Sequence, residues 1–199
     1  MTPTEILKTE HRAIEVVLEC LMRIAQQAEQ GGQLDTASAA QAIEFLQAFA
    51  DARHHVKEER LLFEQLVARG WQRDGGPIGV MIADHEEGRA LIRKMVMARN
   101  AAAAGDASAA KEFARNAEAY VNLLRGHIRR EDLVLFARAD LALAPADQAS
   151  LLAAFERADA QHEATRPCGR TLDLARELAD RFGVPATALS EAGCGPHQD

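Results

Sequence analysis

The sequence predicts an all-α protein, an antiparallel up-down four-helix bundle with an additional C-terminal helical segment. The 199 residues are rich in alanine and leucine, and only 5% are aromatic. This composition favours helices over sheets, which prefer β-branched and aromatic residues. Long stretches of helical periodicity are joined by short polar or glycine-containing connections, a pattern typical of antiparallel bundles.

Four long segments carry apolar residues at the spacing of one helix face. The first ends at Gly31-Gly32 and the third begins at Pro77, and both are common residues at such helix ends. We therefore expect residues 1–144 to form the bundle. Its four helices are expected at about residues 4–29, 36–69, 77–104 and 107–143.

The C-terminal part of the chain is predicted to contain shorter helices than the bundle. Residues 145–183 are expected to form a helical extension that packs on the bundle, with helices at about 147–164 and 171–182. Residues 184–199 show no periodicity, so a flexible tail is expected there. No second domain is expected.

Charge and composition exclude several classes of function. The net charge is −7 and no long basic run occurs, so a nucleic-acid binder is not expected. No apolar run approaches the ~20 residues that a membrane span needs, and the polar N-terminus does not resemble a signal peptide. The three widely spaced cysteines favour a reducing compartment, so we expect a cytoplasmic protein with no membrane partner.

A ten-residue pattern occurs twice, as HHVKEERLLF at 54–63 and as HIRREDLVLF at 127–136. Both strings place His first, Glu fifth, Leu ninth and Phe tenth. On a helix, residues four apart lie on one face, about 6 Å apart along the axis. The pairs His54 with Glu58 and His127 with Glu131 are therefore each expected to point an imidazole and a carboxylate into one small volume.

The first and third predicted helices each add one histidine in line with apolar residues, His11 and His85. A lone histidine on an apolar face is more often a core residue than a ligand. Burying four histidines and two glutamates without compensation, however, costs several kcal/mol per group. Metal coordination removes this cost, so the set predicts a metal site.

The repeat also indicates which residues beside the expected ligands are not ligands themselves. His55 aligns with Ile128, which lacks any ligand atom in its side chain. We therefore expect His55 and Glu59 at the surface or between helices rather than among the ligands. Cys20 lies on the opposite face of its helix from His11 and is expected to be inert.

Six ligands exceed the four of a tetrahedral zinc site. They suit a pair of ions, each bound by two histidines, with both glutamates bridging. Nitrogen and oxygen donors without a thiolate favour iron, with manganese as the second choice. One coordination position is then left for a small ligand.

The motifs EHRAIE, HHVKEERLLF, DHEEGRAL and HIRREDLVLF resemble the hemerythrin-like (HHE cation-binding) domain family over about residues 4–143. The resemblance implies a non-haem di-iron centre with an oxo or hydroxo bridge inside an antiparallel bundle. The ligands that it implies are His11, His54, Glu58, His85, His127 and Glu131.

Oxygen-carrying members of the family have a second histidine four residues after the third-helix ligand, where this chain has Arg89. The set of four histidines and two glutamates is more similar to family members tied to iron–sulfur repair and to nitric-oxide or peroxide stress. Those repair proteins carry an N-terminal cysteine-bearing segment, whereas this chain begins with the bundle.

Three residues are candidates for supporting the ligands. Glu15 lies one turn after His11 and either accepts a hydrogen bond from a ligand histidine or is a partly exposed helix residue. Arg89 either pairs with a carboxylate near the site or reaches solvent. Tyr120 either packs in the core or donates a hydrogen bond to bound oxygen. A weaker candidate for a redox pair or a minor metal site consists of Cys168, Cys194, His162 and His197.

The expected function is that of a di-iron protein that binds or reacts with oxygen, nitric oxide or peroxide in redox or stress response. Whether it is an enzyme of the oxidase or peroxidase type stays open at this point. The alternatives are an iron-sensing or iron-handling protein without catalysis, and an oxygen-binding carrier. The sequence leaves the oligomeric state open.

Overall fold

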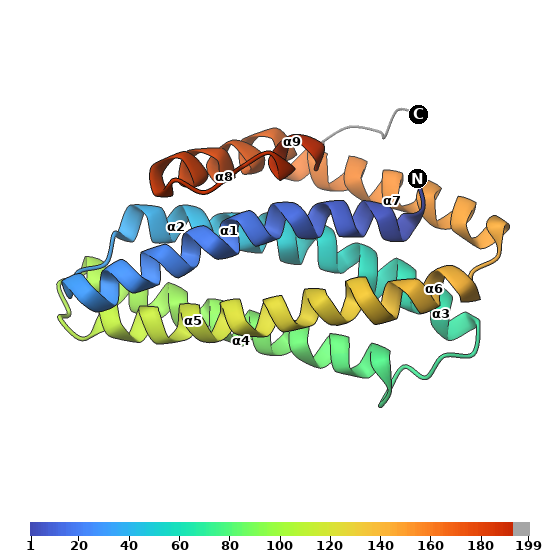
Figure 1. Cartoon of the computed structure of the whole chain (residues 1–199), viewed down its shortest axis with the longest axis horizontal. Coiled ribbons are helices and arrows are strands. Elements are labelled where there is room, and N and C mark those ends of the chain that lie inside the picture. Colours follow the sequence, from blue (N-terminus) through green and yellow to red (C-terminus); the bar gives the residue numbers. More distant parts are fainter. Residues whose placement is uncertain (193–199) are drawn as a thin grey trace.

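The computed structural model describes residues 1–192, and every regular element in this range is a helix (Figure 1). The prediction of an all-α protein is confirmed. Among the described helices, none is both long enough and apolar enough to cross a membrane.

Four helical rods lie lengthwise beside one another (Figure 1). The first and third rods are single helices, α1 (Pro3–Gly31) and α4 (Pro77–Ala103). The second and fourth rods are composite, because α-helix alternates in them with π-helix. The second consists of α2 (Thr36–Phe45), η1 (Leu46–His55), η2 (Glu58–Leu62) and α3 (Phe63–Ala68). The fourth consists of α5 (Ala109–Arg130), η3 (Glu131–Leu135) and α6 (Phe136–Ala142).

The ends of the first rod follow from local chemistry. The Thr2 hydroxyl accepts a hydrogen bond from the Glu5 backbone N–H, and the Glu5 carboxylate accepts one from the Thr2 backbone N–H. This capping box satisfies two N–H groups that a helix start leaves unpaired. Gly32 ends α1 in the left-handed region with φ 67°, where a residue without a side chain is favoured.

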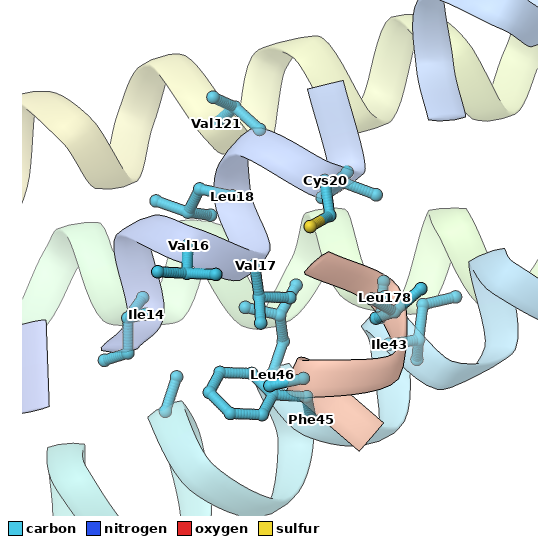
Figure 2. Packing of buried hydrophobic residues seen from close by; sticks show 14 of the residues in the cluster. Ile14, Val16, Val17, Leu18, Cys20, Ile43, Phe45, Leu46, Val121 and Leu178 are labelled. Atoms are coloured by element: carbon cyan, nitrogen blue, oxygen red, sulfur yellow. The ribbon is translucent and has the colours of Figure 1, made fainter. Parts of the chain in front are cut away.

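The apolar core is divided into two clusters. The larger contains residues such as Val17, Phe45 and Val121, part of which Figure 2 shows. The smaller contains residues such as Leu7, Phe63 and Phe136. His11 lies in sequence between Leu7 of one cluster and Ile14 of the other, so a polar layer separates two apolar ones.

The π-helical segments are placed at the candidate ligands. Segment η1 ends at His55, and η2 and η3 begin at Glu58 and Glu131. A π-helix bonds each residue to the fifth residue along, so a turn holds an additional residue. Along the second and fourth rods, side chains therefore do not point in the directions expected from 3.6 residues per turn.

The C-terminal extension consists of α7 (Pro145–Thr165), α8 (Cys168–Phe182) and α9 (Ala188–Glu191). Helix α8 packs against α1 and α2, and α7 packs against α1, η1 and η2. Phe155 of α7 joins the smaller apolar cluster, while Leu178 of α8 joins the larger one.

The expected flexible tail at 184–199 is wrong for its first part. Val184 and Leu189 are buried in the larger apolar cluster, and Leu189 lies in the short helix α9. A short apolar anchor of this kind has too few residues to show periodicity. Cys194 and His197 lie outside the described residues, so the candidate redox pair or minor metal site stays a prediction.

Candidate metal centre

The six predicted ligands meet in the polar layer between the two apolar clusters. Each side chain is almost fully buried, with at most 1% of its surface exposed. Every rod contributes at least one of them. The six residues are His11, His54, Glu58, His85, His127 and Glu131.

A first group of ligand atoms comes from α1, the second rod and the fourth rod. His11 Nε2 lies 3.2 Å from Glu131 Oε2, and His54 Nε2 lies 3.4 Å from Glu58 Oε1. One ligand atom from each of these four residues lies within 4.8 Å of the others. This spacing is close enough for one ion to be bound by all four.

A second group lies beside the first and has the same compactness, with its ligand atoms within 4.8 Å of one another. His85 Nε2 and His127 Nε2 are 3.0 Å apart, and Glu58 Oε2 lies 3.4 Å from His85 Nε2. Glu58 thus belongs to both groups, with Oε1 toward the first and Oε2 toward the second. Glu131 Oε2 is also near both, because it lies 3.1 Å from His127 Nε2.

The fourth member of the second group is His55, which was expected at the surface or between helices and not among the ligands. His55 is 5% exposed, and its ring stacks on that of His85 with 3.8 Å between centroids. The π-helical turn that ends at His55 alters the phase of the rod, so both histidines of the doublet face inward. The doublet itself was the only signal in the sequence.

A carboxylate accepts a hydrogen bond from Nδ1 of each predicted histidine, and each carboxylate belongs to a neighbouring rod. The pairs are His11 with Asp132 at 2.8 Å, His54 with Glu10 at 3.0 Å, His85 with Glu59 at 2.7 Å and His127 with Asp84 at 3.3 Å. An Nδ1–H that donates to a carboxylate leaves Nε2 as the atom that binds a metal.

These supporting carboxylates close a ring around the bundle. Each one is the sequence neighbour of a candidate ligand, as Glu10 is of His11. The first rod supports the histidine of the second, the second that of the third, the third that of the fourth, and the fourth that of the first. The orientation of every imidazole therefore depends on the packing of two adjacent rods.

Comparison with known proteins agrees with this geometry. Residues 2–139 match the family described as the hemerythrin HHE cation binding domain. The chain belongs to this family. The hemerythrin-like chain is 26% identical over 136 residues to uncharacterized proteins of Mycobacterium bovis and Mycobacterium tuberculosis. The match covers 68% of the chain but 52% of each relative, so the chain spans about half the length of the curated relatives it matches. No solved structure matches the chain.

The hemerythrin-like centre has buried atoms that fit a cation. Within the described residues, five side-chain atoms in the polar layer have no hydrogen-bond partner, namely His11 Nε2 and both carboxylate oxygens of Glu58 and of Glu131. Buried polar atoms without a partner are rare and destabilising. A cation in the first group would give a partner to His11 Nε2 and to one oxygen each of Glu58 and Glu131, and a cation in the second group would give one to the other Glu58 oxygen.

The pKa values of two histidines in the metal-free centre also indicate that it fits a cation. Burial opposes the charge on His54, but the carboxylates of Glu58 and Glu10 raise its pKa to about 9. Burial also opposes the charge on His127, whereas Glu131 and Asp84 raise its pKa to about 10. Protons thus occupy positions that a metal cation takes when it binds.

Of the two alternatives left open for Glu15, the structure shows the partly exposed helix residue. Its side chain is 38% exposed and pairs with Arg12 at 3.1 Å, while Asp132 takes the His11 Nδ1 hydrogen bond. The hydrogen-bond acceptor of His11 thus belongs to a neighbouring rod and not to its own helix.

Arg89 holds one of the supporting carboxylates. Its guanidinium donates to Glu59 at 2.7 Å and to Asp51 at 2.8 Å. Of the two alternatives left open for Arg89, the structure shows the pairing with a carboxylate near the site. Glu59 therefore lies between Arg89 and His85, rather than at a plain solvent-facing position.

A buried charge network links the centre to the extension, and no sequence pattern indicated it. Lys57 is fully buried and donates to Glu10, the partner of His54, and it lies 3.0 Å from Asp159 of α7. Arg53 donates to Asp159 at 2.8 Å. Two cations and two anions compensate one another, as buried charges require. Asp159 is too far along the chain for local pattern reasoning to find.

Tyr120 is buried and lines a cavity of about 160 Å³ beside the second group. Burial raises the pKa of its hydroxyl, and the nearby Asp51 carboxylate raises it further. The tyrosine is therefore a neutral group near His85 and not an anionic ligand.

Proposed function

We propose that this hemerythrin-like chain holds two iron ions and binds or reacts with small oxidants, namely oxygen, nitric oxide or peroxide, in redox or stress response. The observation that carries the proposal is Glu58, whose two partnerless oxygens face two different ligand groups. A carboxylate in this position suits a bridge between two ions. An up-down order of the four rods is part of the same proposal, because the short connections favour it.

Iron is the metal that the donor set favours. The described groups offer imidazole nitrogens and carboxylate oxygens and no thiolate. This mixture suits iron, with manganese as the second choice. We assign His11 and His54 to one ion and His85 and His127 to the other, with Glu58 and Glu131 between them.

The two proposed ions have unequal surroundings. His55 adds a third imidazole to the second group, whereas the first group has two. The iron ions supply the electrons or the coordination position with which a small oxidant reacts or binds. The chain itself fixes the imidazoles through the carboxylate ring and keeps bulk water out with the two apolar clusters.

A second candidate function is iron handling without catalysis. The five partnerless buried atoms favour it, because a cation that satisfies them also stabilises the folded chain. Iron binding would then change the stability of the folded chain, and no catalytic turnover would be observed. Oxygen carriage is the third alternative, and Arg89 stands where the carriers of the family have a further histidine.

The experiment that separates these functions is anaerobic reduction of the iron-loaded protein, followed by oxygen, nitric oxide or hydrogen peroxide under optical spectroscopy. Catalytic loss of peroxide would support an enzyme of the peroxidase type. A reversible oxygen adduct would support carriage or sensing. Iron binding without any spectral response to the three oxidants would contradict oxidant chemistry and favour iron handling.

A further inference from the structure

The cavity beside the second ligand group is lined by both polar and apolar side chains. His55 and His85, both buried, lie where the cavity meets the metal centre. Leu46, Ile92 and Leu124 line it with apolar side chains, and Tyr120 adds a ring with a hydroxyl. A molecule in this cavity would therefore touch both the centre and an apolar surface.

The size of the cavity exceeds what a diatomic ligand needs. Its volume is about 160 Å³. A water molecule takes roughly 30 Å³ in the liquid, and an engineered apolar cavity of roughly 150 Å³ binds benzene. The cavity therefore has room for an organic molecule of about six non-hydrogen atoms.

Glycine at position 88 keeps part of this room open. A Cβ atom there would lie 3.4 Å from Tyr120 Cε2 and 3.6 Å from Leu124 Cδ2. A methyl group would just fit, but a longer side chain would have to enter the cavity. Position 88 is therefore the place where the cavity can be filled by one substitution.

The hydroxyl of Tyr120 indicates a polar group on the ligand. The side chain is 3% exposed, and its hydroxyl makes no hydrogen bond to another residue in the part of the chain that the structure describes. The hydroxyl oxygen keeps some accessible surface, so it can donate a hydrogen bond to a ligand oxygen in the cavity.

The charges at the rim favour a neutral ligand over an anion. Arg89 is engaged by Asp51 at 2.8 Å and by Glu59 at 2.7 Å, so its charge is already compensated. Arg93 also lines the cavity, but it is exposed and solvated, so a ligand anion would gain little from it and would face the Asp51 carboxylate. Burying an unpaired charge is strongly unfavourable.

We propose that this cavity is the binding site for a small neutral organic hydroperoxide of about six non-hydrogen atoms. Its apolar group lies against Leu46, Ile92 and Leu124, and its peroxide oxygens lie toward Tyr120 and the centre. This inference rests on the proposed function and names the substrate class of the same site. Two ferrous ions held by the histidines and glutamates of the centre would supply the two electrons that cleave the O–O bond, and two protons from solvent would complete the alcohol and a water molecule.

The first test measures binding without chemistry. tert-Butyl alcohol, which matches the organic part of tert-butyl hydroperoxide, is titrated into the full-length protein as purified, and saturation-transfer NMR follows its binding. We expect saturable binding that Gly88→Leu abolishes and that Tyr120→Phe weakens about two- to tenfold, the range for one net hydrogen bond. The exposed Met97, on the same helix as Gly88, provides the control Met97→Ala, which should bind as the unmodified protein does.

The second test measures selectivity. The iron-loaded, reduced protein is mixed with tert-butyl hydroperoxide or with hydrogen peroxide, and the two oxidation rates are compared. We expect Gly88→Leu to lower the ratio of the organic to the hydrogen peroxide rate at least about tenfold, because only the larger substrate needs the filled space. Circular dichroism checks that the variant is folded, and Tyr120→Phe repeats the test without adding volume.

The outcomes separate this inference from the proposed function. Protein that contains iron but does not bind tert-butyl alcohol, or a rate ratio unchanged by Gly88→Leu, would overturn the cavity assignment alone. Binding of the alcohol to protein that takes up no iron would overturn the proposed function and leave the cavity as a site for small organic molecules.

Discussion

Glu10 of α1 and His54 of the second rod are joined by a hydrogen bond of 3.0 Å from His54 Nδ1 to Glu10 Oε2. Glu10 is also the sequence neighbour of the ligand candidate His11 and accepts a hydrogen bond from the buried Lys57. One side chain thus orients an imidazole of the centre, ties two rods together and compensates a buried cation.

Replacing Glu10 should therefore weaken both the metal centre and the fold. In Glu10→Ala, His54 loses its orienting acceptor and Lys57 stays buried without one of its two anions. We expect metal affinity to fall about 10- to 100-fold and the free energy of unfolding to fall by about 3–5 kcal/mol. Competition with a chelator and denaturant unfolding measure the two effects.

Glu15→Ala is the matched control for Glu10→Ala. It removes a glutamate from the same helix, but this one is partly exposed, and its ion pair within residues 1–192 is with Arg12. Its effect on stability should stay below about 1 kcal/mol, as for other exposed ion pairs. Equal losses in the two variants would show that Glu10 supports the fold only as any helix residue does.

His55 is expected to bind the second ion. His55→Phe keeps an aromatic ring against His85 but removes both nitrogen atoms. We expect the protein to lose one of its ions, or to bind it at least about tenfold more weakly, while the first ion stays. Elemental analysis and chelator titration measure this. Unchanged binding of both ions would show that His55 lines the cavity without being a ligand.

Replacing Glu58 should reduce metal binding more than replacing the adjacent Glu59. Glu58→Ala removes the carboxylate that faces both groups, so both ions should be lost. Glu59→Ala removes the acceptor of His85 Nδ1 and should weaken binding about 10- to 100-fold without abolishing it. Metal content after dialysis against a weak chelator compares the two. Loss of both ions in Glu59→Ala alone would show that the assignment of the bridging residue is wrong.

Metal loading should release protons near neutral pH. The metal-free centre holds protons on His54 and His127, whose pKa values are raised to about 9 and about 10. A metal-bound imidazole nitrogen carries no proton, so loading at about pH 7 must displace these protons. Calorimetry in buffers of different ionisation enthalpy counts them. Loading at this pH without proton release would contradict the electrostatic account.

The same two histidines set the pH dependence of the metal-free protein. Their pKa values are raised above the unfolded value of about 6.5, so their stabilising effect is fully present below that pH. It should be lost as the pH rises through about 9 and 10. Urea unfolding of the metal-free protein across this range measures the loss. A stability that increases over the same range would contradict the assigned ion pairs.

Local periodicity was enough to predict much of the centre. The spacing of His54 to Glu58 and of His127 to Glu131 is a property of one helix, and so is the apolar face that carries His11. These side chains do meet in the structure, and the all-α fold follows from the same periodicity together with the composition. Helix α7 begins at Pro145, close to the expected helix start at about residue 147.

The rest depends on contacts that no single helix encodes. His55 turns inward because the π-helical turn changes the phase, and the sequence offered no sign of that turn. Asp132 of the fourth rod supports His11 of the first, whereas reasoning along one helix could offer only Glu15 as a candidate. Asp159 reaches Lys57 from a helix about a hundred residues further along, and Leu189 anchors a segment too short to be periodic.

The central claim is that the buried histidines and glutamates hold two iron ions in one centre. Elemental analysis of protein purified anaerobically from iron-supplied cells tests it most directly. We expect about two irons per chain, and markedly less in Glu131→Ala, because two compact groups share the bridging glutamates. About one zinc per chain, with iron absent and Glu131→Ala unchanged, would contradict it.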